Sequence, residues 1–478
     1  MGWTTVAELI ALGAAALHLV GLVSAVHAAL WTRTSQGAIA WTVSLATFPY
    51  VAVPLYWILG RYKYRGYIVG RRRESQVFRH VVEALNAQAD DFAAPLPRDR
   101  IALHAAEQLA RMPFTRGNRA RLLVDGEATF EALRQGIAAA QDYLLVQFFI
   151  WRDDELGREL RDRLVERASA GVRVWVLYDE IGSHALPGGF FAPLERAGGS
   201  ASAFGTSRGF VNRFQLNFRN HRKVVVADGR VAWVGGHNVG VEYLGRDPRR
   251  GAWRDTHLEV AGPVVQGLQL AFMEDWNFAA GEVLELDLTL RAAEGGELYA
   301  LPLPTGPADE LETCWLAFVE AIHSARERIW ITSPYFVPDE AVLSALQLAA
   351  LEGVDVRILL PERPDHLLVW LSSFAFYDEV LPVGVKLYRY TEGFLHQKVM
   401  LIDQTVAAVG TANLDNRSFR LNFEVAVVTV GRSFAAEVEA MLERDFARSR
   451  RVGLDDLRLR STSFRVAARL ARLLAPIQ

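Results

Sequence analysis

An internal repeat constrains the fold of this chain more than any other feature of its sequence. Residues 220–228 read NHRKVVVAD and residues 395–403 read LHQKVMLID, so each segment places a His, a Lys and an Asp at identical spacing. Each segment then leads into a glycine turn and an asparagine, Asn238 in the first copy and Asn413 in the second. Two copies of one pattern in matching surroundings predict two related halves. The six motif residues are His221, Lys223, Asp228, His396, Lys398 and Asp403.

The segments before the two motifs repeat as well. In each copy a helical pattern leads into an apolar strand, and a second helical pattern leads into a β-rich strand that starts after a glycine. The paired segments are residues 130–140 and 315–325, 143–150 and 328–333, and 171–177 and 353–359. Alternating helices and strands are typical of α/β folds. We therefore predict two pseudo-symmetric α/β halves with mostly parallel strands, whose motif strands meet at one active-site cleft.

The use of lysine also distinguishes the motifs. Of the 52 basic residues only four are Lys, and two of these, Lys223 and Lys398, occupy equivalent motif positions. Because a strand repeats every two residues, the His and Lys of one motif point to the same face. A lone His-x-Lys pair is typical of a half-exposed strand, whereas two matched pairs indicate a shared phosphate site. Zinc is disfavoured, because ammonium is not a ligand and His237 is the one further His near either motif.

The paired motif resembles that of the phospholipase D superfamily. Three neighbouring segments are similar to those of bacterial cardiolipin synthases, and the likeness covers nearly the whole chain. These segments are Trp253–Thr256, Ser333–Pro338 and Gly410–Ser418. The resemblance implies that one phosphatidylglycerol gives its phosphatidyl group to the enzyme, glycerol leaves, and a second phosphatidylglycerol accepts the group to form cardiolipin. It also implies a phosphohistidine intermediate, no nucleotide or metal cofactor, and a more structural than catalytic role for Asp228 and Asp403.

The residue types fit transfer at a phosphodiester. Attack on this anion requires its charge to be neutralised, in the role that metal ions play elsewhere. Four side chains can donate hydrogen bonds to the phosphate oxygens: Lys223, Lys398, Asn238 and Asn413. One imidazole can attack phosphorus while the other protonates the leaving alcohol and then deprotonates the incoming one. The residues alone leave open which His is the nucleophile, and the superfamily resemblance favours His221.

A carboxylate follows each motif at a matching position. Residues 255–262 read DTHLEVAG and align in register with residues 424–431, which read EVAVVTVG. Asp255 and Glu424 can each accept a hydrogen bond from one ring nitrogen of a catalytic His, which fixes the tautomer and the ring orientation. We therefore predict that both carboxylates orient a histidine.

Two apolar runs precede the repeats, at residues 9–30 and 39–59. Each has about the 20 residues that are needed to cross a bilayer, and His18 and His27 are the strongly polar interruptions of the first run. A cleaved signal peptide fits poorly, because the start is not basic and a second run follows directly. Buried helices of a soluble domain are the alternative. We predict a two-helix transmembrane hairpin.

The distribution of cations predicts its orientation. The loop of residues 32–38 carries Arg33, whereas six cations follow the second run: Arg61, Lys63, Arg65, Arg71, Arg72 and Arg73. The positive-inside rule then places both termini and the catalytic halves in the cytoplasm, at the inner membrane of a bacterial cell. There the cleft would face phosphatidylglycerol and other anionic lipid. The single cysteine, Cys314, allows no disulfide within the chain, in agreement with a reducing compartment.

These observations divide the chain into five predicted segments. They are a transmembrane hairpin (1–60), a basic juxtamembrane connector (61–114), two phospholipase D-like halves (115–295 and 296–450) and an amphipathic tail (451–478). The tail has the cationic and apolar faces of an interfacial helix, although a helix that caps the domain explains the pattern nearly as well.

Three classes of function fit to different degrees. A phosphatidyl transferase is favoured, and a phospholipase D-type phosphodiester hydrolase is the alternative, since both use the phosphohistidine and differ in the acceptor. A membrane scaffold is disfavoured because both motif sets are complete. Nucleic acid is disfavoured as a partner by the two apolar runs, the net charge of -3 and the absence of a basic stripe with aromatic residues. The sequence leaves the oligomeric state open, a homo-oligomer included.

Overall fold

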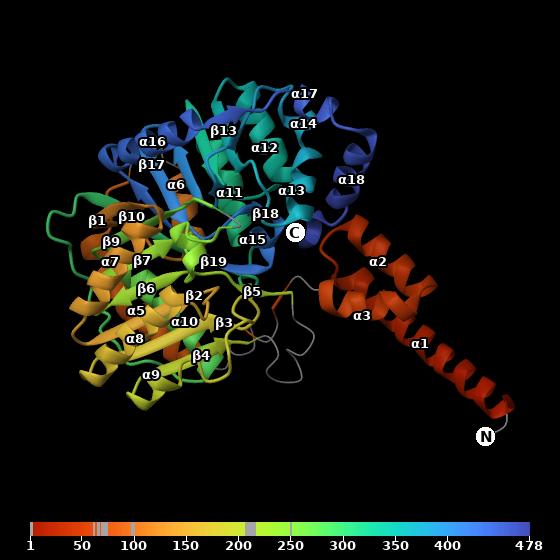
Figure 1. The fold of residues 1–478 in the computed structure, drawn as a ribbon, viewed down its shortest axis with the longest axis horizontal. Coiled ribbons are helices and arrows are strands. Elements are labelled where there is room, and N and C mark those ends of the chain that lie inside the picture. Colours follow the sequence, from red (N-terminus) through yellow and green to blue (C-terminus); the bar gives the residue numbers. More distant parts are fainter. Residues whose placement is uncertain are drawn as a thin grey trace. The chain divides into compact units, whose positions relative to one another are not determined.

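The computed structural model describes residues 3–60, 63–64, 67, 75–96, 101–205, 217–248 and 251–478 (Figure 1). They belong to two compact units, one formed by Met1–Val69 with Thr206–Phe218 and the other by Gly70–Gly205 with Arg219–Gln478. Of the six cations predicted to follow the second apolar run, Lys63 is described, and the other five, Arg61, Arg65, Arg71, Arg72 and Arg73, lie outside the described residues.

The larger unit contains the two predicted α/β halves. The elements of the first half are β1 (Thr115–Val124), α7 (Asp125–Ala139), β2 (Tyr143–Phe148), α8 (Glu155–Ser169), β3 (Arg173–Asp179), α9 (Ala192–Arg196), β4 (Ser200–Phe204), β6 (Val224–Ala227), β7 (Val231–Gly235), β9 (Thr256–Ala261) and α10 (Val264–Ala280). Those of the second half are β10 (Leu298–Thr305), α11 (Thr313–Ser324), β11 (Arg328–Thr332), α12 (Glu340–Leu351), β13 (Asp355–Pro361), α14 (Tyr377–Val380), β14 (Lys386–Tyr390), β16 (Val399–Ile402), β17 (Val406–Gly410), β19 (Asn422–Val430) and α16 (Arg432–Ala447).

The strands of both halves join into one sheet. Its order is β20-β14-β13-β11-β16-β17-β19-β10-β1-β9-β7-β6-β2-β3-β4, where β20 is Ser449–Arg451. Reading outward from the central β1–β10 pair, the two halves repeat the same strand order. The register repeats too, since Val225 pairs with Trp233 in the first half and Met400 pairs with Ala408 in the second. The two pseudo-symmetric halves predicted from the sequence are therefore confirmed.

The expectation of a mostly parallel sheet is wrong. Parallel pairing is confined to β2–β3–β4 and β11–β13–β14 within this sheet path, and the strands between them are antiparallel. The reason lies in the connections that follow the motifs. Residues 228–230 and 403–405 are short turns, and such turns join antiparallel neighbours, whereas parallel strands need a long crossover.

Two short strand pairs connect the halves near the motifs. Strand β5 (Arg219–Asn220), which precedes the first motif His, pairs with β19 of the second half. Strand β15 (Phe394–Leu395), which precedes the second motif His, pairs with β8 (Trp253–Arg254) of the first half. Each motif His therefore lies next to a segment of the opposite half, and that segment carries one of the predicted orienting carboxylates.

Within residues 3–60, one helix is long and apolar enough to cross a membrane. It is α1 (Trp3–Trp31), and residues Val6–Trp31 have a mean hydropathy of 2.2. The second predicted span is not a single helix, because it is divided into α2 (Ser35–Thr47) and α3 (Pro49–Leu59). Pro49 has no N–H and disfavours helical geometry at the residue before it, Phe48, which has φ −137° and ψ 59°.

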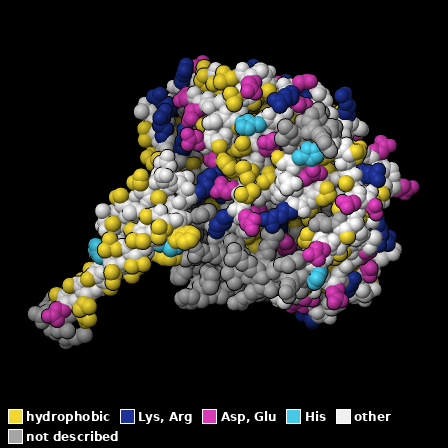
Figure 2. All heavy atoms as spheres, turned by 180° about the vertical axis from the view of Figure 1, so that it is seen from behind, with side chains coloured by type: hydrophobic (Ala, Val, Ile, Leu, Met, Phe, Trp, Pro, Cys, Tyr) yellow, Lys and Arg dark blue, Asp and Glu magenta, His cyan; other side chains and the backbone are white. Residues whose placement is uncertain are grey.

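Side-chain contacts give the path of α2 and α3 along α1. Thr42 on α2 donates to the carbonyl of Ala25 at 3.4 Å, and Tyr50 at the start of α3 lies 3.4 Å from His18. Further along α3 the hydroxyl of Tyr56 is 2.6 Å from Nδ1 of His27. Helix α2 therefore runs towards the middle of α1, and α3 turns back. The predicted hairpin of two spanning helices is not found: one long helix is followed by two shorter helices that pack along it, with hydrophobic side chains on their surfaces (Figure 2).

The remaining helices cover the larger unit. They include α5 (Ser75–Phe92), α6 (Ile101–Ala110), α13 (Leu367–Phe374), α15 (Asn416–Arg420), α17 (Asp455–Arg458) and α18 (Thr462–Arg472). In the predicted tail, α18 packs on α13 through Phe464, whose ring contacts Trp370 and Phe374. Ala468 and Ala471 are buried in the same contact. The tail helix therefore packs on the larger unit, while its side chains Val466, Leu470 and Leu473 remain exposed.

Candidate active site

The four basic motif side chains lie just before the central strands β6 and β16 and are buried. His221 and His396 each expose 8% of their surface, Lys223 is fully buried and Lys398 exposes 4%. Burial of a charged or titratable group has a large cost unless other groups compensate, so partners are expected around each of them.

Each histidine is held by a carboxylate from the other half. Nδ1 of His221 is 2.9 Å and 3.0 Å from the two carboxylate oxygens of Glu424, and Nδ1 of His396 is 2.8 Å from Oδ2 of Asp255. The carboxylates are fixed in turn. Glu424 accepts from the hydroxyls of Thr411 (2.6 Å) and Ser418 (2.8 Å). In each ring the bonded Nδ1 leaves Nε2 for chemistry.

The two lysines are held by the backbone of their own motifs. Nζ of Lys223 donates to the carbonyl oxygen of His221 at 2.6 Å, and Nζ of Lys398 donates in the same way to the carbonyl of His396. The two-residue period of extended chain places each ammonium group beside its own His. Burial lowers the pKa of Lys398 to about 8 and lowers that of Lys223 well below its ordinary value.

The pKa shifts of the paired groups favour a neutral imidazole, which is the form that can act as a nucleophile. Burial lowers the pKa of His221 to about 4, and burial together with the Lys398 charge lowers that of His396 well below its ordinary value. Burial alone raises the pKa of Glu424, but His221 and Lys223 outweigh it and hold this pKa below its ordinary value. At neutral pH a neutral imidazole therefore donates from Nδ1 to a carboxylate, and its Nε2 lone pair is free to attack.

Asn238 and Asn413 are buried, as the phosphate-binding prediction requires, but their side chains have protein partners here. Asn238 accepts from the N–H of Ile150 at 3.0 Å and donates to the hydroxyl of Tyr243 at 3.0 Å. Asn413 donates to Asp415 at 3.4 Å, while its Oδ1 has no partner among the described residues. In this arrangement Asn238 shapes the loop at the end of β2, and donation to phosphate requires a change of partner.

Asp228 and Asp403 lie outside the cleft. They follow the far ends of β6 and β16, seven residues from their His, which in extended chain is about 23 Å. Both have left-handed backbones, with φ of 53° and 49°. Each carboxylate accepts three backbone N–H groups, those of residues 141–143 for Asp228 and 326–328 for Asp403. They hold the strands β2 and β11 beside the motif strands and do not touch the histidines.

Sequence reasoning missed two buried carboxylates that support the motifs. Arg222, between His221 and Lys223, bonds Asp275 on α10 at 2.8 Å. In the second half Gln397 takes the same position and bonds Asp445 on α16 at 2.8 Å. Asp445 also forms a bidentate ion pair with Arg254, at 2.8 Å and 2.7 Å. A signal existed, because each aspartate lies one helical turn after apolar residues, Asp275 after Ala271 and Phe272 and Asp445 after Met441 and Leu442.

Two buried, reciprocally paired histidines with two lysines, at the junction of two related α/β halves, form the arrangement expected of the phospholipase D-like class. Comparison with known proteins narrows this class. Residues 133–247 and 318–446 match the family described as "Cardiolipin synthase, PLD-like domain". The chain belongs to this family.

Similar proteins of known name agree with this assignment. Cardiolipin synthase A of Pseudomonas fluorescens strain Pf-5 is 50% identical over 466 residues, which cover 97% of each chain. Cardiolipin synthase A of Pseudomonas aeruginosa strain LESB58 is 50% identical over 464 residues, covering 96% of this chain and 94% of that protein. The crystal structure of phosphatidylserine synthase from Haemophilus influenzae Rd KW20 covers 79% of this chain and 100% of its own, with a TM-score of 0.59 and 14% identity, which shows a shared fold.

Proposed function

We propose that this chain is a phosphatidyltransferase that forms cardiolipin and glycerol from two molecules of phosphatidylglycerol. The observation that carries the proposal is the reciprocal pairing of His221 with Glu424 and of His396 with Asp255. It provides two imidazoles with fixed tautomers in one site, as a two-step transfer requires.

In the first step Nε2 of His221 attacks phosphorus and forms an N–P bond, while the bond from phosphorus to the glycerol oxygen breaks. His396, protonated when the anionic lipid enters, gives its proton to that oxygen, and glycerol leaves. Glu424 stabilises the positive charge that develops on His221, and Asp255 does so for His396. The assignment of His221 as nucleophile is supported by its contact with both oxygens of Glu424.

In the second step the hydroxyl of another phosphatidylglycerol replaces glycerol. His396 takes its proton, the oxygen forms a bond to phosphorus, and the N–P bond to His221 breaks. Lys223 and Lys398 neutralise the phosphate in both steps, assisted by Asn238 and Asn413 once they turn towards it. Asp228 and Asp403 position the motif strands from their far ends.

These groups need no nucleotide or metal cofactor. Four donors and two imidazoles already supply charge neutralisation, the nucleophile and proton transfer, which are the functions a metal would serve. The described part of the chain holds no group of three His, Cys, Asp or Glu side chains placed to bind a metal ion.

Hydrolysis is the alternative, because water can attack the same phosphohistidine. Product analysis separates the two functions. Purified protein in phosphatidylglycerol vesicles is expected to yield cardiolipin and glycerol, whereas phosphatidic acid and glycerol as the main products would refute the transferase.

We further propose that residues 1–60 hold the catalytic halves at the cytoplasmic face of a bacterial inner membrane. Helix α1 is long enough to cross, and the re-entrant α2–α3 pair returns the chain to the end of α1 that precedes Arg33. On this path Arg33 and Lys63 lie on the same side of the membrane, which the positive-inside rule favours as the cytoplasmic side. The N-terminus is then outside. The connector (61–114), the two phospholipase D-like halves (115–295 and 296–450) and the tail (451–478) keep the roles predicted from the sequence as part of this proposal.

A further inference from the structure

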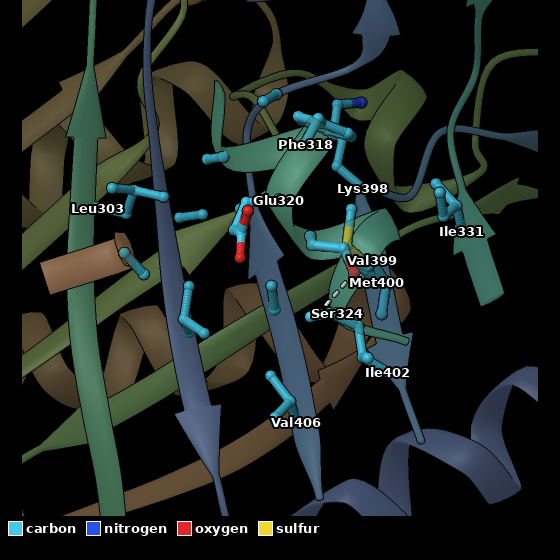
Figure 3. A pocket seen from close by; sticks show the side chains of 18 of the residues that line it. Leu303, Phe318, Glu320, Ser324, Ile331, Lys398, Val399, Met400, Ile402 and Val406 are labelled. Carbon is cyan, nitrogen blue, oxygen red and sulfur yellow. Dashed lines mark hydrogen bonds between the residues drawn. The ribbon is translucent and has the colours of Figure 1, made fainter. Parts of the chain in front are cut away.

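An apolar cavity of about 130 Å³ lies in the second half, between the sheet and the helices α6 and α11 (Figure 3). Its walls are mostly aliphatic and aromatic, and Glu320, Ser324, Thr332 and Ser333 add a few polar groups (Figure 3). The walls include Leu103 from α6, Phe318 from α11, and Ile331, Met400 and Val428 from the sheet. The side chain of Lys398 also forms part of the wall. The cavity therefore adjoins the candidate active site.

In the first half a tryptophan occupies the equivalent place. Trp233 on β7 is buried, exposing 3% of its surface, and its counterpart in the repeated register is Ala408 on β17. The helix above the indole is adapted to it. A Cβ added at Gly136 of α7 would lie 2.0 Å from the indole ring, so an indole requires glycine there. The counterpart of Gly136 on α11 is Ala321, which lines the cavity.

The two halves of the repeat thus differ at this place: the second half has a cavity where the first has the indole of Trp233. An empty space of this size forfeits packing contacts and has a cost in stability that the first half avoids. Side chains around it, including Ala408, Ala426 and Val428, are partly exposed although they lie in the middle of the sheet. The space is therefore open towards the surface.

We propose that this cavity receives one acyl chain of the substrate phospholipid. The proposal rests on the proposed function, which brings the lipid phosphate to Lys398. Lys398 connects the two sites, because its ammonium group belongs to the phosphate site and its side chain lines the cavity. An acyl chain is joined to the phosphate through glycerol, so a phosphate at Lys398 brings a chain to the cavity. The apolar walls exclude glycerol or a second phosphate as the occupant.

The size of the cavity fits part of a chain. An apolar cavity of about 150 Å³ binds a benzene ring, so 130 Å³ holds a few methylene groups, and the open mouth accommodates more. Each methylene removed from water improves binding by about fourfold. For phosphatidylglycerols that are monomeric in water, kcat/KM should therefore rise about fourfold for each methylene that enters the cavity.

The repeat itself supplies the variant that tests this. Ala408→Trp combined with Ala321→Gly reproduces the Trp233 and Gly136 pair of the first half and fills the cavity. Cardiolipin formation is measured with dihexanoyl, diheptanoyl and dioctanoyl phosphatidylglycerol, each below its critical micelle concentration. The wild type is expected to show the rise with chain length, and the double variant is expected to lose it while keeping its rate on the shortest lipid.

A matched control fills a different space. A smaller apolar pocket lies beside α5 and α10, and Ala89→Leu fills it at a site that Lys398 does not line. This control should keep the wild-type dependence on chain length. If the Ala408→Trp/Ala321→Gly variant is folded, has a raised Tm and keeps that dependence, the cavity is only a packing defect and the inference is overturned. If the wild type forms no cardiolipin from any lipid, the proposed function itself fails.

A second measurement uses the unaltered protein. Phosphatidylglycerol with a diazirine on one acyl chain is irradiated with the wild type, and the labelled peptides are identified by mass spectrometry. Label is expected on α6 or α11, near Leu103 and Phe318. Label elsewhere in the protein with none on these helices overturns the inference, whether or not the filled variant folds.

Discussion

The reciprocal pairing makes a specific prediction for Glu424→Gln and Asp255→Asn. Each change keeps the size of the side chain and removes its charge, in a position that exposes 1% of its surface or less. A hydrogen bond to a charged group contributes about 1.5–3 kcal/mol, so its loss from a transition state slows the step by about 10- to 150-fold. A wrong tautomer of the ring adds to this loss. Both variants should therefore form cardiolipin at least tenfold more slowly.

The two variants should differ in which step is slow. Glu424→Gln weakens the nucleophile, so the phosphohistidine forms slowly from any substrate. Asp255→Asn weakens the acid, so a substrate with p-nitrophenol in place of glycerol, whose leaving group needs no proton, should restore a fast burst. The assay is quenched-flow detection of nitrophenolate in a single turnover. Rescue of Glu424→Gln in place of Asp255→Asn would show that the nucleophile is His396. Equal bursts from both variants and wild type would refute the pairing as a catalytic device.

Three further predictions follow from the charges and the helices. The kcat/KM should fall as pH rises through about 8, because Lys398 then loses its proton, and Lys398→Arg should weaken this fall although its rate is lower, while any fall due to Lys223 remains; an unchanged alkaline limb would contradict the assigned role of Lys398. Single-turnover formation of the phosphohistidine should be unaffected by excess chelator, and its loss would reveal a metal site. In a Cys314→Ala background, Thr4→Cys should label with an impermeant thiol reagent in intact cells, while Ser35→Cys and Ser449→Cys should label only after lysis; the reverse result for Thr4 and Ser35 would support a hairpin with two crossings.

The repeated motifs predicted the two halves because spacing along a strand translates directly into position. His221 and Lys223 must share a face wherever the strand lies, and a second copy at identical spacing must sit in an equivalent place. The reciprocal contact of each His with the opposite half was not predictable in the same way. It depends on β5 pairing with β19 and on β8 pairing with β15, which are two-residue contacts between distant parts of the chain.

The errors have identifiable causes. Hydropathy averages over residues 39–59 and does not register that Pro49 divides them, so the run was expected to be one helix. Parallel pairing was inferred from the strands around the helices, while the turns at Asp228 and Asp403 make the central strands antiparallel. The cavity depends on one difference between aligned strands, Trp233 in the first half and Ala408 in the second. It could not be predicted without knowing which helix packs over each of these residues.

The crossed pairs also affect how this sequence can vary over evolutionary time. His221 and Glu424 are separated by 203 residues, and His396 and Asp255 by 141, yet each pair shares a hydrogen bond. A substitution at either carboxylate is therefore compensated in the other half of the chain and not in its own. Among relatives, correlated substitutions should link the surroundings of Glu424 to those of His221, and those of Asp255 to those of His396. Because each carboxylate acts on the histidine of the other half, we expect the two halves of the repeat not to diverge independently.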